Sequence, residues 1–439
     1  MQSGCLPEHL LRSPELLERY LIEQRSPALA TLGLPDDFVV PCHGVSIANL
    51  PATLAEILGA KLTGAAGPLP DAMWMGLADG VQRVVWLILD AAGWLDLCAL
   101  LQEEPELSLA RLARDGRCLP ITSVFPSTTS SALTTLWTGY GPAQHGLVGH
   151  ILYLREFGTV VDMLIFSPMG VRQRDEMIGR GLVPEEFAPV PGLAEALVGQ
   201  GVTTRTLINL DLAMTGFSRI SYRGVAEVGR FVTAADMCVR LRHMLSAHSN
   251  ERLLLVGYMH EVDNIGHVDG PGGDAWRAGV RSLAFSLERE FLNGLTPEER
   301  RGTMLVLTSD HGQLPQPGAS IYTTDHQELR SHLLLPATGG MRAAYLYARQ
   351  GYVDAVEAYA REHLAEQFVP IRAGAALETG LLGSGRLAPE AASRLGDVLL
   401  IARDHYVLDH RKREHPPMGM HGGLTRWEML SPLLMARLD

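Results

Sequence analysis

The chain has 439 residues, of which 46% are hydrophobic and 20% are charged. This balance is typical of a globular protein with one large α/β domain or two domains, stable without disulfide bonds. The formal net charge of −12 argues against a basic groove for extended nucleic acid. A small phosphate ester is not excluded, because bound metal ions add positive charge that the formal count omits.

Cysteine usage and the N-terminus bear on the compartment. The five cysteines are widely spaced and form no CxxC pair, which argues against a disulfide framework and against a thiolate metal site. Residues 1–20 lack the basic and apolar regions of a signal peptide, and no apolar run is long enough to span a bilayer. We therefore expect a reduced, cytoplasmic protein with no membrane partner, and we leave open whether it forms a homodimer.

The first part of the chain differs from the rest. Ser13 and Pro14 suit the N-cap and the first position of a helix that runs through Gln24, and the following residues are rich in Pro, Gly and Ala. We interpret residues 1–80 as an N-terminal extension packed on the core, and residues 81–439 as the main domain.

From residue 83 onward, apolar runs alternate with helical patterns. The runs are typical of buried parallel strands and cover 83–90, 204–210, 252–258, 303–310 and 397–403. The helical patterns cover 97–116, 192–199, 232–247 and 274–293. This order predicts an α/β fold with a mainly parallel central sheet and helices on both faces. Residues 150–190 and 313–395 interrupt the alternation and are read as insertions, either of which could form a cap over the site.

Acids and histidines fall where these predicted strands end. They are Asp90, Asp263 with His267, Asp310 with His311, and His421 in a glycine-rich segment. Each alone has an ordinary explanation, such as an Asx turn, a helix cap, a hydrogen-bonded pair or a surface loop. Ligands of open α/β sheets, however, bind outside the carboxyl ends of the strands. We therefore expect most of these side chains to meet at one edge, where carboxylate and imidazole groups suit a divalent metal.

A run of hydroxyl side chains supplies a candidate nucleophile. Thr128, Thr129, Ser130 and Ser131 precede a predicted helix that ends at Thr138. A hydroxyl at a helix N-terminus lies near unpaired backbone N–H groups, which favour anions such as phosphate. These hydroxyls could instead only cap the helix. A metal ion would favour the catalytic interpretation, because coordination can deprotonate a hydroxyl near neutral pH.

The order of these motifs resembles the alkaline phosphatase superfamily, specifically its nucleotide pyrophosphatase/phosphodiesterase branch. FPSTT, the later TG and PxxHG are similar to the nucleophile segment of the family, YxxxxDxxGHxxGP (258–271) to its central motif, and SDHG and MHGG to its last two motifs. The resemblance covers residues 83–439. It implies an alkaline phosphatase-like fold and a metal-dependent phosphoric ester hydrolase that acts on small phosphate esters.

The resemblance also implies roles for single residues. Counting back from the TG pair places the nucleophile on Thr129 rather than Thr128. One metal ion is expected to be held by Asp263, His267 and His421, and a second by Asp90, Asp310, His311 and Thr129. The mixture of histidine and carboxylate suits two zinc ions, with manganese as the main competitor. The family mechanism implies a phosphothreonine intermediate that water hydrolyses, with net retention at phosphorus.

Three positions bear on the substrate. Ser130 stands where nucleotide-cleaving members often have a phenylalanine that packs on the base, which weakens the case for nucleotides. His150 stands where the family has an asparagine near a phosphate oxygen, and it is either a substrate-binding residue or a neutral loop residue. Tyr258 matches a tyrosine often found at the site and is the second expected substrate-binding residue, although it could be a core residue.

The substrate class stays open at the level of sequence. A phosphodiesterase is the expected function, and a phosphomonoesterase or a phosphonate hydrolase on the same fold are the alternatives. The chain has only two lysines and only modest room for a cap, which disfavours a sugar-phosphate mutase. A metal-binding scaffold without turnover is the alternative that is not an enzyme, and the seven competent ligand positions argue against it.

Overall fold

The computed structural model describes residues 6–315, 320–410 and 412–439. Among these residues, seven strands form the main sheet in the order β2-β18-β9-β1-β8-β6-β7. Their bounds are β1 (Arg83–Leu89), β2 (Arg117–Thr122), β6 (Thr203–Asn209), β7 (Glu227–Phe231), β8 (Leu253–Met259), β9 (Thr303–Thr308) and β18 (Leu430–Arg437). The five strands from β9 to β7 are parallel, whereas β18 is antiparallel to both of its neighbours.

Both faces of the main sheet are covered, as the continuous apolar runs predicted. Val84, Trp86 and Ile88 of β1 pack into one hydrophobic cluster, and the alternate residues pack into another on the opposite face. One face is covered by α5 (Trp94–Glu103), α6 (Ser108–Asp115), α13 (Ala234–Ala247) and α15 (Asp274–Ser286). The other is covered by α3 (Leu50–Ile57), α7 (Thr129–Thr138), α11 (Leu193–Val198) and α12 (Gly216–Ser221). The predicted α/β fold class is confirmed.

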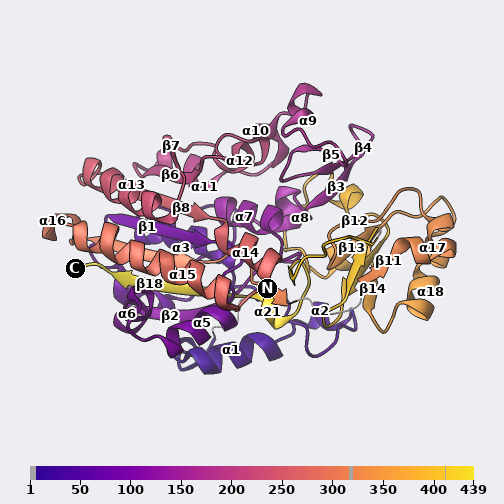
Figure 1. Ribbon diagram of the computed structural model, residues 1–439, viewed down its shortest axis with the longest axis horizontal. Helices are drawn as coiled ribbons and strands as arrows, with labels where there is room; N and C mark the ends of the chain where they lie inside the picture. Colours follow the sequence, from indigo (N-terminus) through magenta and orange to yellow (C-terminus); the bar gives the residue numbers. More distant parts are fainter. Residues whose placement is uncertain (1–5, 316–319, 411) are drawn as a thin grey trace.

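A second sheet lies beside the first one (Figure 1). Its order is β14-β15-β13-β12-β3-β4-β5, and its neighbouring strands are antiparallel. The bounds are β3 (Ile151–Leu154), β4 (Thr159–Asp162), β5 (Ser167–Pro168), β12 (Thr338–Gly339), β13 (Ala343–Leu346), β14 (Phe368–Arg372) and β15 (Val398–Ala402). The two predicted insertions, 150–190 and 313–395, therefore meet in one sheet, through the pairing of Gly339 with Ile151. Helices α17 (Gln327–His332) and α18 (Val353–His363) lie at its outer side.

Two sequence predictions are wrong in detail. The segment 397–403 was expected to join the parallel sheet, but β15 pairs antiparallel with β13 and β14 in the second sheet, because an apolar run does not specify its partner strands. The single helix expected over 97–116 is two helices, α5 and α6. Pro105 lies between them, and a proline disfavours the helical conformation of the residue before it; Glu104 has φ −125° and ψ 70°.

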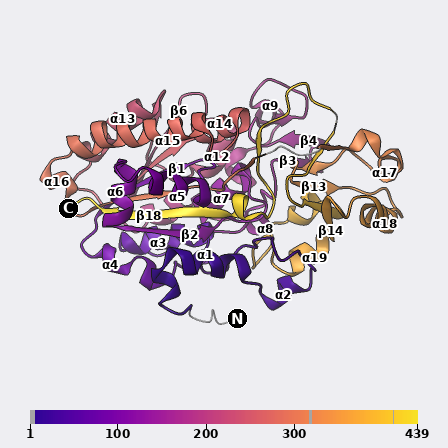
Figure 2. The same ribbon diagram turned by 60° about the horizontal axis from the view of Figure 1, so that its bottom comes forward.

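The N-terminal segment packs under the main sheet (Figure 2). Helix α1 (Pro14–Glu23) begins after Ser13, whose Oγ accepts a hydrogen bond from Leu16 N at 3.3 Å, so the predicted cap is confirmed. Among the described residues, no helix is both long and apolar enough to cross a bilayer. The shorter elements are α2 (Pro27–Ala30), α4 (Met75–Ala78), α8 (Pro142–His145), α9 (Glu176–Gly179), α10 (Pro184–Phe187), α14 (Glu261–Asp269), α16 (Pro297–Arg300), α19 (Ala373–Glu378), α20 (Ala391–Arg394), α21 (Arg426–Met429), β10 (Leu314–Pro315), β11 (Ser320–Tyr322), β16 (Val407–Asp409) and β17 (Gly419–Met420).

Candidate metal centre

Three neighbouring parallel strands place five of the predicted ligands. β1 ends directly before Asp90, β9 is followed by Asp310 and His311, and β8 leads into α14, which carries Asp263 and His267. β1 pairs in parallel with both β8 and β9, so the carboxyl ends of the three strands lie at the same edge. The structure therefore brings these five side chains together as the strand pattern predicted.

The sixth side chain, His421, arrives by a different route. It follows β17, which pairs antiparallel with β10, so that Met420 lies opposite Leu314 just after the Asp310 loop. A Cβ at Gly312 would lie 2.1 Å from the carbonyl oxygen of Trp427, so only glycine permits the close approach of α21 to this loop. This tertiary contact brings the C-terminal segment to the strand ends.

The first group of potential ligands is Asp263, His267 and His421. One ligand atom from each lies within 4.8 Å of the others. His267 Nε2 is 3.4 Å from Asp263 Oδ2, as expected for residues four apart on one helix face, and His421 Nε2 is 3.7 Å from Asp263 Oδ1. This group joins the helix after β8 to the C-terminal glycine-rich loop.

The second group is Asp90, Asp310 and His311, all buried. His311 Nε2 lies 3.6 Å from Asp90 Oδ1 and 3.3 Å from Asp310 Oδ2. The two groups adjoin, because the rings of His311 and His421 stack with their centroids 4.0 Å apart. The arrangement is a compact cluster of three carboxylates and three imidazoles.

The histidines are oriented by backbone carbonyls. In each of the three, Nδ1 lies at hydrogen-bond distance from a carbonyl oxygen, which can only accept, so Nδ1 donates and Nε2 is the ring nitrogen that faces the other candidate ligands. The partners are Gly419 O for His267 (2.7 Å), Ser127 O for His421 (3.2 Å) and Gly312 O for His311 (3.0 Å). Burial and the neighbouring rings of His311 and His267 hold the pKa of His421 well below its usual range, which favours the neutral, metal-binding form.

The buried carboxylates of the cluster require a positive charge nearby. Asp90 Oδ1 and Asp310 Oδ2 are buried without a hydrogen-bond partner, and both face His311 Nε2. Burial raises the pKa of Asp90 well above its usual range, and the negative charges of Asp310 and Asp263 raise it further. A buried cation would compensate these charges and fill the free coordination positions. The residues present therefore fit a divalent metal ion in each group.

Thr129 lies against the second group. It is the first residue of α7, and its Oγ lies at hydrogen-bond distance, 3.2 Å, from His311 Nε2. Thr128 occupies the N-cap position and makes no side-chain capping bond. The interpretation of these hydroxyls as simple helix caps therefore does not describe Thr129, whose side chain points to the metal centre.

The expected substrate-binding residues lie in two places. The Tyr258 hydroxyl donates to Asp90 Oδ2, so this ring contacts the metal centre. His150 Nε2 lies 3.3 Å from Asp162 Oδ2, a partner that the sequence did not indicate. Ser130 is fully buried and donates to Gly149 O at 2.9 Å, so it packs inside the fold and offers no surface to a base.

Two supporting interactions were missed at the level of sequence. Gln313 Nε2 donates to Asp263 Oδ1 at 2.5 Å, and a Cβ at Gly266 would lie 1.7 Å from Gln313 Oε1, so a side chain there would displace this amide. The buried ion pair of Arg342 and Glu428 holds the loop after His421. Gln313 directly follows the DHG motif, so its place beside the site could have been predicted from the sequence. The ion pair joins residues 86 positions apart, and no local sequence pattern indicates it.

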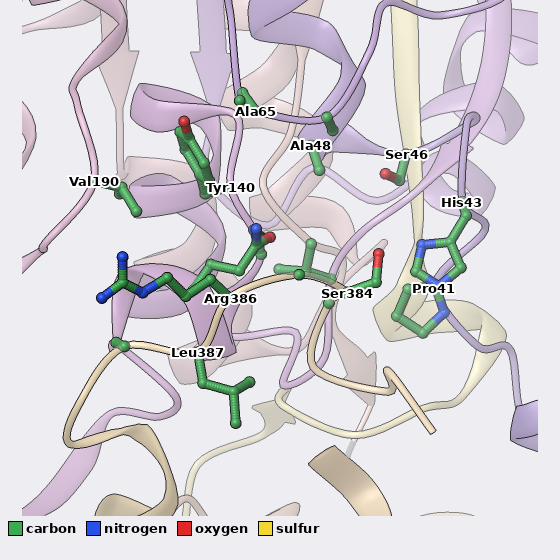
Figure 3. Close-up of a pocket in the computed structure, with 18 of the residues that line it drawn as sticks. Pro41, His43, Ser46, Ala48, Ala65, Tyr140, Val190, Ser384, Arg386 and Leu387 are labelled. Carbon is green, nitrogen blue, oxygen red and sulfur yellow. Dashed lines mark hydrogen bonds between the residues drawn. The ribbon is translucent and has the colours of Figure 1, made fainter. Parts of the chain in front are cut away.

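Two cavities differ in how they lie relative to this cluster. One of about 190 Å³ is bordered by Asp90, Thr129 and Asp263. A larger one, about 550 Å³, is bordered by none of the predicted ligands; Figure 3 shows Tyr140 and Arg386 on one side of it and His43 on the other. The smaller cavity is therefore the one from which a substrate would reach the candidate ligands.

Comparison with known proteins supports the same conclusion. The family model of type I phosphodiesterase/nucleotide pyrophosphatase matches residues 84–169 and 211–424, which is more than half of the chain and includes every predicted ligand. None of the curated proteins compared matches the sequence significantly.

Solved structures share the fold at low sequence identity. Human ectonucleotide pyrophosphatase/phosphodiesterase 5 superimposes with a TM-score of 0.62 at 15% identity, covering 80% of this chain and 87% of its own. Phosphonoacetate hydrolase from Sinorhizobium meliloti with phosphonoformate gives 0.59 at 20% identity, covering 80% and 89%. An inactive threonine-to-alanine variant of the mouse phosphodiesterase 5, in complex with AMP, gives 0.56 at 14%, covering 80% and 87%. By its family match and its fold, the chain belongs to the type I phosphodiesterase/nucleotide pyrophosphatase family and is an enzyme of the phosphoric ester hydrolase class.

Proposed function

We propose that the chain hydrolyses phosphodiesters through the nucleophile Thr129, with two divalent metal ions, zinc before manganese, held by the two ligand groups. The observation that carries the proposal is the position of Thr129 Oγ, 3.2 Å from His311 Nε2 and at the N-terminus of α7. The inactive threonine-to-alanine variant of the mouse relative supports a threonine in this role. Phosphodiester preference itself rests on the family match.

In the proposed mechanism, backbone and side-chain groups of this protein have separate roles. The backbone N–H groups at the start of α7 favour the phosphoryl oxygens of the substrate. Thr129 Oγ loses its proton to solvent and attacks phosphorus in line, and the ester bond opposite to it breaks so that the alcohol oxygen leaves. Water then attacks the phosphothreonine in line, the Thr129 Oγ–phosphorus bond breaks, and the threonine oxygen takes up a proton as the phosphate monoester is released. Metal ions bound to the six ligands would supply Lewis-acid stabilisation of the attacking and departing oxygens. Tyr258 orients Asp90, and Gln313 orients Asp263, through the hydrogen bonds described above.

A panel of nitrophenyl esters tests this function. The metal-loaded protein is assayed on a phosphodiester, a phosphomonoester and a phosphonate ester, beside Thr129→Ala and the matched control Thr128→Ala. We expect the diester to have the highest kcat/KM, Thr129→Ala to lose at least about 10³-fold, and Thr128→Ala to stay within about tenfold. Full activity of Thr129→Ala would show that the nucleophile is wrong.

The other outcomes separate the alternatives. Preferred turnover of the monoester or the phosphonate would replace the diesterase by a monoesterase or a phosphonate hydrolase on the same site. Metal-loaded protein that turns over none of the esters would instead indicate a scaffold. With a chiral phosphorothioate diester, two successive in-line displacements predict retention at phosphorus, and inversion would contradict the covalent intermediate.

A further inference from the structure

A pocket opens from the metal centre along the nucleophile helix, and we call it the α7–α12 pocket. Its volume is about 190 Å³. Asp90, Thr129 and Asp263 border it on the side of the metal centre, and the walls beyond them are mainly apolar. The apolar wall includes Leu133 and Trp137 of α7, Leu164, Ile208, Phe217 of α12 and Tyr222.

The wall is apolar because of helical spacing. Thr129, Leu133 and Trp137 are four residues apart, so they lie on one face of α7. Trp137 is buried and packs edge-on against Tyr222, with the ring centroids 4.9 Å apart and an interplanar angle of 67°. Trp86 of the central strand lies behind it at 6.4 Å. A substituent attached to a phosphorus near Thr129 would therefore enter a rigid aromatic and aliphatic enclosure.

The volume limits what the pocket holds. An apolar cavity of about 150 Å³ accommodates benzene, whereas pockets for drug-sized ligands begin near 300 Å³. At about 190 Å³, the α7–α12 pocket suits one ring or one branched alkyl group and is too small to enclose a whole nucleoside. Among the polar residues at its border, Arg174 and Asn264 are exposed, and Thr215 and Ser218 hydrogen-bond within the fold. Ser221 Oγ and His260 Nδ1 are buried without a partner, so the pocket offers these two atoms to a polar atom of the seated group but no charged partner.

The position of the nucleophile identifies which part of the substrate enters. In an in-line displacement the leaving group departs on the side of phosphorus opposite to the attacking oxygen. Thr129 itself borders the pocket, so a group inside the pocket lies beside the nucleophile rather than opposite to it. The pocket therefore suits the ester group that stays on phosphorus.

We propose that the substrate is a phosphodiester whose retained ester group is an uncharged aryl or branched alkyl group of about the size of benzene, seated in the α7–α12 pocket. The proposal rests on the proposed diesterase function and narrows its substrate class. It assigns specificity to the apolar wall, and Leu133 and Trp137 take the place of a base-packing residue after the nucleophile.

Three diesters with the same 4-nitrophenolate leaving group test the assignment. They carry phenyl, methyl or thymidine as the retained group and are assayed with the full-length, metal-loaded protein. One buried methylene is worth roughly tenfold or more in discrimination, so we expect kcat/KM for the phenyl ester to exceed that for the methyl ester at least about tenfold. We expect the thymidine ester to fall below the phenyl ester. Equal values for phenyl and methyl, or a preference for thymidine, would overturn the proposal.

A pocket-filling variant with a matched control locates the effect. Leu212 is half-buried and lines the pocket, whereas Leu210 on the same loop is 49% exposed and does not line it. In Leu212→Trp we expect the ratio of phenyl to methyl kcat/KM to fall about tenfold, and in Leu210→Trp we expect the wild-type ratio. An unchanged ratio in Leu212→Trp would show that the discrimination arises elsewhere.

A binding measurement keeps this inference separate from the proposed function. Calorimetric titration of metal-loaded Thr129→Ala with diphenyl phosphate and with dimethyl phosphate is run at several temperatures. Burial of apolar surface makes the binding heat capacity more negative, so we expect a more negative value and at least about tenfold tighter binding for the diphenyl ester. No turnover of any diester would contradict the proposed function, and this titration would still show whether the pocket prefers the aryl ester. Equal binding of the two ligands would overturn the pocket assignment alone.

Discussion

Glu428 holds the C-terminal loop that carries His421 through a buried ion pair with Arg342. Arg342 Nε and Nη2 each donate to the Glu428 carboxylate at 2.9 Å, and both side chains are fully buried. The same carboxylate accepts from Gly423 N at 2.8 Å and from Thr425 Oγ at 2.7 Å. Gly423 is two residues after His421, so the ion pair fixes the segment that presents that imidazole.

The change Glu428→Gln removes the charge and turns an N–H group toward donors. Breaking a buried ion pair by removing one partner costs about 3–5 kcal/mol, because the other charge stays buried without compensation. At about 2.1 cal/mol/K per residue, unfolding of 439 residues in one transition carries about 0.9 kcal/mol/K of entropy. The Tm of Glu428→Gln should therefore be about 3–5 °C below that of the wild type.

The assay is a thermal melt at pH 7, followed by calorimetry and by circular dichroism. Glu23→Gln is the control, because its partner Arg19 and the carboxylate are 75% and 61% exposed, and we expect no measurable change in Tm. The double variant Arg342→Met with Glu428→Met removes both charges and should recover most of the loss. A Tm of Glu428→Gln within 1 °C of the wild type would refute this reasoning.

The pH dependence has a defined sign. Burial alone would raise the pKa of Glu428, but the Arg342 guanidinium and the accepted hydrogen bonds outweigh it and lower the pKa below its ordinary 4.5. A carboxyl whose folded pKa is lowered stabilises the fold above its unfolded pKa, and that stabilisation is lost as the pH falls through the folded pKa. The difference in Tm between wild type and Glu428→Gln should therefore be constant above about pH 5 and shrink below about pH 4. A difference that grows on acidification would contradict this sign.

Three further predictions concern the metal centre. Gln313→Leu removes the donor to Asp263 and should weaken metal binding about 10–100-fold in competition with a chromogenic chelator, whereas Gln367→Leu, a glutamine outside the metal centre, should leave it unchanged. Removal of metal by dialysis against a chelator should lower the Tm by several degrees, because a bound ion at about a thousand times its Kd stabilises the fold by about 4 kcal/mol. Adding zinc should restore the Tm, and an unchanged melt after dialysis would argue against buried metal. His421→Ala should reduce bound metal from about two ions per chain to about one by elemental analysis, while retention of two would remove His421 from the ligand set.

The sequence determined the positions of most candidate ligands because two local patterns have fixed geometric consequences. An apolar run that ends in an acid marks the carboxyl end of a buried strand, and neighbouring parallel strands end at one edge, as Asp90 and Asp310 do. Asp263 and His267 are four residues apart on a helix and therefore share a face. The fold class followed from the same alternation of strands and helices.

Only the tertiary structure decided the rest, because pairings between distant segments leave no local pattern. The short ladder of β10 with β17 brings His421 to the centre, and backbone carbonyls with no sequence signature fix the protonation of its ring. Residues near Ile151 and Gly339 join two insertions in one sheet, although the sequence showed only two separate interruptions. The pocket beside Thr129 exists because α12 packs against α7, and its volume depends on how these side chains meet rather than on their order in the chain.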